Sequence, residues 1–463
     1  MLVLVALSLF QLLVTGTNVV EDTKPPAASD QVTYQFSGDD FGLGTNDSVS
    51  ADVDTFAPWS YKPACTAKIS EIDSELCVYT DRFFSDGRGI SIFTTPEVAK
   101  EFASLLASLK SSVKPDDEPG VNQFTGAWYT HPVAGKGIGM LAKHDRSRGD
   151  IITAYTPVLL AYKEDLLPKD QREKFLRLAI DQLPIPSREA YWDLATLSDN
   201  DDEDSHRAQD IAGANAFEIR LEEKKGSKSK ASAADVSGSG TAHLAVIPEA
   251  SRMNHDCAPN AIFYINASTL AHVVRATRPI RKGEEITIAY TNPLTPRAVR
   301  QKYLSDAFHF TCTCSRCLRD GRTDTHTNAG SDIDVDAALS EITSLQNTLS
   351  RWSDPASDAS IKHAERLVQL HRDEGLEGYL DPAYCYAALM YSAVGSLRGA
   401  QKYVALAIEA IELRLGPGAP DLPAWRAMLD DPTRHWSWMV RKRGGASGYG
   451  HGHGHGSRVR GEL

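Results

Sequence analysis

The chain has 463 residues, of which 42% are hydrophobic, and it carries a formal net charge of −12 with a pI near 5.6. This length allows two or three domains with real cores, and the acidic balance excludes binding of nucleic acid through overall charge. Seven cysteines are too few for a disulfide scaffold. Inside the chain no apolar run reaches the roughly 18 residues that a membrane span needs.

The N-terminus begins with an apolar run over residues 2–14. Its length is that of a signal-peptide core and is too short to cross a membrane. We therefore expect a secretory signal over residues 1–16, with cleavage before Thr17. The positively charged segment that usually precedes such a core is missing. The alternatives are a mis-assigned start or a buried N-terminal segment.

Residues 17–123 form an N-terminal extension that begins with a polar stretch lacking helical periodicity. Two strands are expected at 78–80 and 88–93. A helix is expected at 96–109, since Thr95 can cap it and a proline occupies its first position. The extension also holds Cys65 and Cys77, which form a disulfide in an oxidising compartment and stay free thiols otherwise. The sequence leaves both possibilities open.

The middle of the chain, 124–292, alternates strands with turns and contains most of the candidate site residues named below. Strands are expected over 124–164, around a glycine-rich turn at 135–139. Residues 165–212 have helical character, chiefly at 171–183 and 188–197. Residues 222–242 are rich in Lys, Ser, Gly and Ala, which predicts a disordered loop.

The C-terminal part is expected to be helical. After a polar linker, residues 334–440 repeat apolar side chains at helical spacing, which predicts antiparallel helix pairs of the tetratricopeptide type. Cys385 falls in one of these helices and is expected in its core. The glycine- and histidine-rich tail, 441–463, is expected to be disordered.

Three of the seven cysteines, Cys312, Cys314 and Cys317, lie within six residues of one another. Such spacing suits thiolates that converge on one tetrahedral zinc, which needs four ligands. Cys257 is the obvious fourth donor. The alternative is a group of ordinary buried thiols.

Three motifs follow one another between residues 254 and 317. The first is Asn254-His255-Asp256-Cys257, with Pro259-Asn260 just after it. The second is Gly283-Glu284-Glu285-Ile286-Thr287-Ile288-Ala289-Tyr290, and the third is the Cys312–Cys317 cluster. Their order and spacing resemble the C-terminal half of a SET domain, the fold of S-adenosylmethionine-dependent protein lysine methyltransferases. The helical C-terminus is similar to that of the SET-and-MYND family, although no cysteines for a MYND finger occur between Cys77 and Cys257. The extension resembles those of fungal-type SET proteins.

The resemblance implies an α+β fold: a mostly-β SET domain of small sheets with a pseudoknot at 124–292, and a post-SET zinc segment at 293–320. A C-terminal helical module would follow. It also implies that Cys257, Cys312, Cys314 and Cys317 hold a structural zinc.

The resemblance also assigns roles to single residues. Tyr290 would be the catalytic residue that orients the amine. S-adenosylmethionine would be bound by Lys136, Gly137, Ile138, Gly139, Met140, Asn254, His255 and Phe310. Asn215, Phe217 and Phe308 would line the lysine channel. Alternative readings are a tight turn for the glycines, a structural hydrogen bond for His255 and simple packing for Tyr290.

The function expected from these motifs is S-adenosylmethionine-dependent lysine N-methylation of a protein substrate. The alternative is an inactive, possibly secreted SET-fold protein that binds partners through its helical module. The two lines of evidence on location disagree, because a signal peptide predicts the secretory pathway whereas the resemblance predicts the nucleus or cytoplasm. Direct binding of nucleic acid is not expected.

Overall fold

The computed structural model describes residues 56–111, 120–197, 206–222, 240–266, 269–319 and 335–444. The chain divides into a unit Met1–Ala57 and a unit Pro58–Leu463, and the structure below is that of the second unit. The expected signal at 1–16, the interior of the 222–242 loop, the linker before residue 335 and the tail beyond residue 444 lie outside the described residues. No described helix combines the length and apolar character that crossing a membrane requires.

The largest sheet joins the N-terminal extension to later strands. Its order is β1-β2-β3-β7-β9-β8. The bounds are β1 Ala64–Cys65, β2 Cys77–Asp81, β3 Ile90–Thr94, β7 Leu159–Tyr162, β8 Ala216–Glu222 and β9 Gly240–Val246. β3 runs parallel to β7. The two strands expected in the extension are therefore confirmed, and they belong to the same sheet as strands of the middle region.

The extension also contains the short α2, Phe84–Gly87, and α3, Pro96–Ser111, which confirms the helix expected at 96–109. The question left open by its two cysteines is answered by the structure. Cys65 and Cys77 face each other across β1 and β2 and form a disulfide.

Helices of the insert cover one face of this sheet. They are α4 Lys169–Asp181, α5 Ile185–Trp192 and α6 Arg207–Asn215. Phe175 of α4 stacks on Phe93 of β3, with 5.4 Å between the ring centres. The helix expected at 188–197 was misplaced, because Pro184 and Pro186 fix the first turn of α5 and start it earlier. The ends of the segment 222–242 are strand and not disordered loop, because β8 includes Glu222 and β9 starts at Gly240.

A four-stranded sheet of order β10-β13-β5-β4 brings the sequence motifs together. Its strands are β4 Trp128–Val133, β5 Gly137–Ala142, β10 Asn254–His255 and β13 Glu285–Ile288. β10 runs parallel to β13, with Asn254 opposite Thr287 and His255 opposite Ile288. β13 in turn pairs with β5, the strand that follows the glycine turn. A three-stranded sheet of order β11-β12-β6 completes the region; its strands are β6 Ile151–Tyr155, β11 Ala261–Asn266 and β12 Ala271–Ala276.

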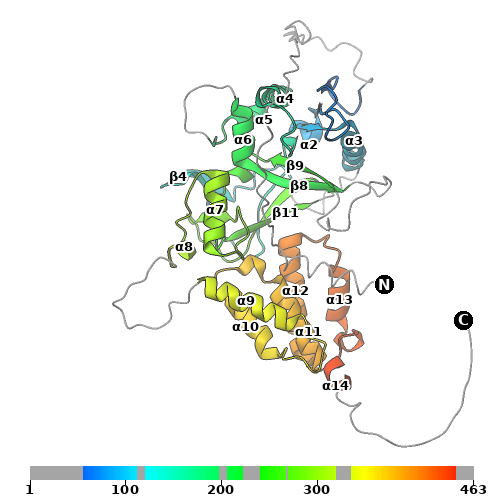
Figure 1. Ribbon diagram of the computed structural model, residues 1–463, viewed down its shortest axis with the longest axis vertical. Helices are drawn as coiled ribbons and strands as arrows, with labels where there is room; N and C mark the ends of the chain where they lie inside the picture. The colour runs from blue at the N-terminus through cyan, green and yellow to red at the C-terminus, as the bar shows by residue number, and fades with distance from the viewer. Residues whose placement is uncertain are drawn as a thin grey trace, which may run out of the picture. The chain divides into compact units, whose positions relative to one another are not determined.

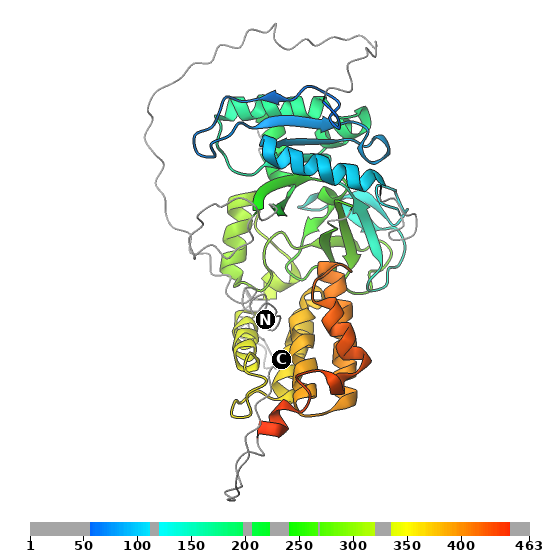
Figure 2. The same cartoon turned by 90° about the vertical axis from the view of Figure 1, so that its right-hand side faces the viewer.

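The C-terminal part of the chain, from α7 on, is helical, and its segment from residue 335 confirms the helical module that was expected (Figures 1 and 2). α7, Arg297–Phe308, and the short α8, Ser315–Arg319, flank the cysteine cluster. The module itself comprises α9 Val335–Leu349, α10 Ile361–Asp373, α11 Asp381–Ala393, α12 Leu397–Leu415, α13 Leu422–Asp430 and α14 Val440–Gly444. Successive helices from α9 to α13 pack on one another. Cys385 is buried in α11, as predicted. The mixed architecture confirms the α+β fold class.

Glycines let the helical module approach the small sheets closely. A Cβ on Gly416, just after α12, would lie 2.6 Å from the Tyr264 ring of β11. A Cβ on Gly378 would lie 2.9 Å from the Thr277 side chain. Both distances are shorter than a carbon–carbon contact allows, so with a larger residue at either position the facing side chain, or the two parts of the molecule, must shift.

A buried histidine makes stability depend on pH. His243 of β9 is fully buried, with Nε2 2.8 Å from the Thr94 hydroxyl and Nδ1 3.0 Å from the carbonyl of Thr241. Burial lowers the pKa of His243 to about 4. The unfolded chain takes up this proton near pH 6.5, so it binds more protons than the folded chain between pH 6.5 and 4.

We therefore expect the free energy of unfolding to fall as the pH is lowered from 7 to 4, by up to about 3 kcal/mol from His243. Urea unfolding across this range measures the loss. His243→Gln keeps polar atoms but does not titrate, so its pH dependence should be smaller. An equal dependence in both proteins would contradict the assignment.

Candidate functional site

β10, β13 and β5 position the side chains of the site. Asn254 Nδ2 donates a 2.8 Å hydrogen bond to Glu285 Oε1, and Glu285 Oε2 forms a 2.8 Å ion pair with Lys136 Nζ. A Cβ on Gly139 would lie 2.9 Å from Asn254 Nδ2 and 2.6 Å from the Val133 side chain. A glycine is therefore required at residue 139 for the Asn254 amide to reach β5.

The strand end beyond β13 places Tyr290 against His255. The Tyr290 backbone N–H donates to His255 Nδ1 at 2.9 Å, and the Tyr290 hydroxyl donates to the carbonyl of Met253 at 2.6 Å. Since Nδ1 accepts, the proton of a neutral His255 ring lies on Nε2, which is 3.2 Å from Cys257 Sγ. Burial lowers the pKa of His255 to about 4 and raises that of Tyr290. Both side chains are therefore neutral near pH 7.

Two aromatic rings close this group. The Phe308 ring lies 5.0 Å from that of Tyr290, and the Phe310 ring lies 6.5 Å from Tyr290 and 6.2 Å from His255. Both phenylalanines are half-buried and pack on the cysteine cluster. Tyr290, two residues beyond β13, thus meets the histidine of β10 and the aromatic residues before Cys312 in one place.

The four cysteines converge as their spacing predicts. All are buried, and their sulfurs lie within 4.8 Å of one another. Cys257 Sγ is 3.6 Å from Cys317 Sγ and 4.0 Å from Cys312 Sγ. Sulfurs on a zinc tetrahedron with bonds of about 2.3 Å lie about 3.8 Å apart, so the set fits that ion. Because disulfide sulfurs lie about 2.05 Å apart, these four are not bonded to one another.

A buried cation stands beside the sulfurs. Arg300 of α7 is fully buried. Burial alone would lower its pKa, but the neighbouring Cys257 and Cys317 outweigh this and raise it. Hydrogen bonding within the cluster, chiefly from Cys257, lowers the pKa of Cys314 to about 5. The same hydrogen bonding lowers the pKa of Cys317 but raises the pKa of Cys257 and of Cys312, so the cluster favours thiolate, the form that binds metal, at two of its four sulfurs.

The remaining predicted residues lie in different surroundings. Gly137 and Ile138 are exposed at the start of β5, and Gly137 has a φ of +74° that favours glycine. The Met140 side chain is fully buried. Asn215 ends α6, where its amide donates to the carbonyls of Ala195 and Ile211.

Phe217, predicted to line the channel with Phe308, contacts a different group. Its ring lies 5.1 Å from that of Phe263 and 4.3 Å from that of His272, which is fully buried. The other channel residue, Phe308, adjoins Tyr290 instead. The ring contacts of the two phenylalanines therefore belong to separate clusters.

Several residues of the site were not singled out from the sequence. Asn260 follows the Cys257 turn, and its side chain accepts from the backbone of Thr287 at 2.9 Å and donates to the carbonyl of Glu285 at 2.8 Å. Asn260 thereby fixes β13 beside this turn. Its place in the first motif was a signal for it, as was the place of Glu285 in the second.

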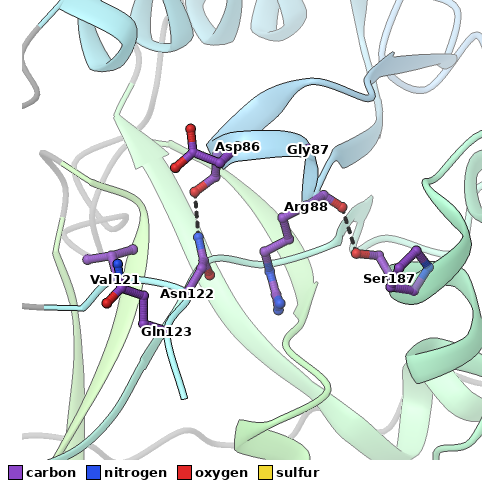
Figure 3. Close-up of a pocket in the computed structure, with 9 residues that line it drawn as sticks. Asp86, Gly87, Arg88, Val121, Asn122, Gln123 and Ser187 are labelled. Carbon is purple, nitrogen blue, oxygen red and sulfur yellow. Dashed lines mark hydrogen bonds between the residues drawn. The ribbon is translucent and has the colours of Figure 1, made fainter. Parts of the chain in front are cut away.

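A pocket of about 360 Å³ lies elsewhere, at residues 85–88, 121–123 and 186–187 (Figure 3). It contains none of the predicted site residues. Its polar groups pair within the protein: Asn122 Nδ2 donates to Ser85 Oγ at 2.6 Å, Ser187 Oγ donates to the Arg88 carbonyl at 2.6 Å, and Arg88 pairs with Glu249. We assign no chemistry to this pocket.

Comparison with known proteins places the site in a family. A family model described as the SET domain matches residues 137–291. Over 72 residues the chain is 46% identical to SET domain-containing protein SmydA-8, isoform A, of Drosophila melanogaster. This aligned segment covers 16% of this chain and 15% of that protein. The chain is 41% identical over 73 residues to N-lysine methyltransferase SMYD2 of Homo sapiens, covering 16% of each. It is 39% identical over 74 residues to histone-lysine N-methyltransferase SMYD3 of Mus musculus, covering 16% and 17%.

The matched segments thus span about a sixth of these relatives. Among solved structures, the crystal structure of the SET domain of LSMT bound to lysine and AdoHcy aligns with 76% of this chain and 98% of that one. The two chains are 13% identical in sequence, and the TM-score of the alignment is 0.24. The family match includes the glycine strand, the Asn254–His255 strand and Tyr290. Residues 137–291 are a SET domain, and the chain is a SET-domain protein.

Proposed function

We propose that this protein transfers a methyl group from S-adenosylmethionine to a lysine side chain of a protein substrate. The observation that carries the proposal is the meeting of Gly139, Asn254, His255 and Tyr290 around β13. The names of the matched relatives, which include lysine methyltransferases, support it.

The proposed reaction requires an amine held neutral and in line with the methyl group, with water excluded. S-adenosylmethionine supplies the methyl group on an electrophilic sulfonium. The Tyr290 hydroxyl donates its hydrogen bond to the Met253 carbonyl, so its oxygen lone pairs are free to accept from the amine. The rings of Phe308 and Phe310 lie 5.0 Å and 6.5 Å from the Tyr290 ring and give this side of the site an apolar wall. The proton that the amine loses passes to solvent.

The residues at the glycine strand suit the amino-acid end of this cofactor. An amino acid carries both charges, and Lys136 with Glu285 offers one partner of each sign. Exposed backbone at Gly137 and Ile138 allows close approach. The Phe310 ring provides a flat apolar surface suited to adenine. We assign cofactor binding to this group.

We infer that the four cysteines hold a structural zinc. The donor set is closed, since four sulfurs complete a tetrahedron and leave no open position for catalysis. His255 Nε2 would donate to the Cys257 thiolate and so links the metal to the Tyr290 backbone.

Binding of S-adenosylmethionine tests the proposal most directly. Titration calorimetry of the purified chain should show saturable binding, and His255→Ala should weaken it about tenfold, because the ring whose two nitrogens hold the Tyr290 backbone and Cys257 beside the site is lost. His144→Ala, an exposed histidine after β5, is the matched control and should bind as the wild type does. A wild-type chain that binds no cofactor at millimolar concentration would instead favour an inactive SET-fold interaction protein.

A further inference from the structure

One arginine ties the three-cysteine segment to the turn of the fourth cysteine. Arg316 lies between Cys314 and Cys317 on α8 and is fully buried. Its Nη1 donates to the Cys257 carbonyl at 3.2 Å and to the Pro293 carbonyl at 2.6 Å. The guanidinium therefore bridges the two parts of the chain that supply the four sulfurs.

The helical module supplies the counter-charge. Glu374, the residue after α10, accepts from Arg316 Nε at 2.9 Å, and the two side chains are 2% and 0% exposed. Glu374 also pairs with Arg319 at 3.3 Å. The chain then turns at Gly375, which has a φ of +68°, and a Cβ there would lie 3.0 Å from the Ala258 Cβ. The end of α10 is thus packed on the turn that carries Cys257.

We propose that Glu374 is a positioning residue for the four-cysteine metal site, so that the C-terminal helical module is a structural part of that site. The inference rests on the proposed metal site but not on methyl transfer. Glu374 acts through Arg316, whose fixed guanidinium holds Cys257 in register with Cys314 and Cys317.

The physical reason is the cost of a buried charge without its partner. Burial lowers the pKa of Arg316 even with Glu374 beside it. If Glu374 loses its charge, the buried guanidinium loses its ion-pair partner, and it has to turn away from the Cys257 carbonyl to find water or another anion. The two halves of the sulfur set then move independently, which weakens a site that requires all four.

The experiment measures metal retention in the full-length protein. Glu374→Gln should release zinc to a chromogenic chelator about 10–100-fold faster than the wild type, the range seen when a group supporting a metal ligand is lost. With Co²⁺ in place of zinc, the thiolate charge-transfer bands should shift. The matched control is Glu341→Gln, which removes a bidentate ion pair with Arg366 in the same module. The side chains of Glu341 and Arg366 are 43% and 41% exposed. This variant should release zinc at the wild-type rate.

A double variant separates positioning from simple stability. Arg316→Met with Glu374→Leu removes both charges, which usually preserves folding, but it also removes the tie to Cys257. We expect normal thermal unfolding with fast zinc release. Wild-type release from Glu374→Gln, or from the double variant, would overturn the inference. A wild-type chain that holds no metal would overturn the metal site as well. A failure of methyl transfer in a zinc-loaded chain would count against the proposed reaction alone.

Discussion

Replacing Tyr290 with phenylalanine is expected to slow the proposed methyl transfer by about 10²–10³-fold, equivalent to about 2.7–4 kcal/mol of barrier. The substitution keeps the ring and its packing on Phe308 but removes the hydroxyl that donates to the Met253 carbonyl. The backbone N–H of residue 290 still donates to His255, so the strand end stays in place. Single-turnover methylation of a lysine substrate measures the effect.

Cofactor affinity and folding should change little in Tyr290→Phe, because the residues to which we assign cofactor binding, Asn254, His255 and Phe310, are unchanged. Tyr303→Phe is a matched control, since Tyr303 is an exposed tyrosine of α7 whose ring lies 6.1 Å from that of Phe308. Its turnover should equal that of the wild type. Wild-type turnover in Tyr290→Phe would mean that another residue orients the amine, or that chemistry does not limit the rate.

Replacing Cys314 with serine is expected to abolish zinc binding and to unfold the segment around Cys312–Cys317. A hydroxyl is a poor substitute for one of four thiolates, and binding of such an ion contributes about 10–16 kcal/mol in small zinc-dependent domains. The zinc content found by metal analysis should fall from about one ion per chain to a small fraction of that.

Cys385→Ala is the control for this variant, because Cys385 is a buried thiol of α11 outside the cluster. It should retain its zinc, although a cavity there costs some stability. Less than about half an equivalent of zinc in well-folded wild-type protein would refute the metal site.

The sequence was most informative where chemistry restricts residue types and spacing. The spacing of Cys312, Cys314 and Cys317 predicted their convergence with Cys257, and the sulfurs do converge. β13 lies beside Asn254 and His255, and Tyr290, two residues after this strand, contacts His255 as expected. Such patterns are local in sequence, and each one carries its own geometric requirement.

Contacts that depend on tertiary packing could not be predicted in this way. Glu374 is one of many acidic residues on helices, and nothing around it in the sequence marks the partner 58 positions earlier. The start of α5 was missed because two prolines were not read as a helix start. The close approach of Gly416 to Tyr264 depends on how α12 meets β11, which periodicity does not report.

The parallel pairing of β3 with β7 has a consequence for any shortened version of this protein. A fragment that starts near residue 124 keeps every motif of the SET domain but loses β1, β2 and β3. β7 would then be an edge strand with a row of unpaired N–H and C=O groups. Leu159, Leu160 and Ala161 are fully buried in the intact chain, so this edge would also be apolar. An apolar open edge recruits strands from other molecules, and such a fragment would aggregate before its chemistry could be measured.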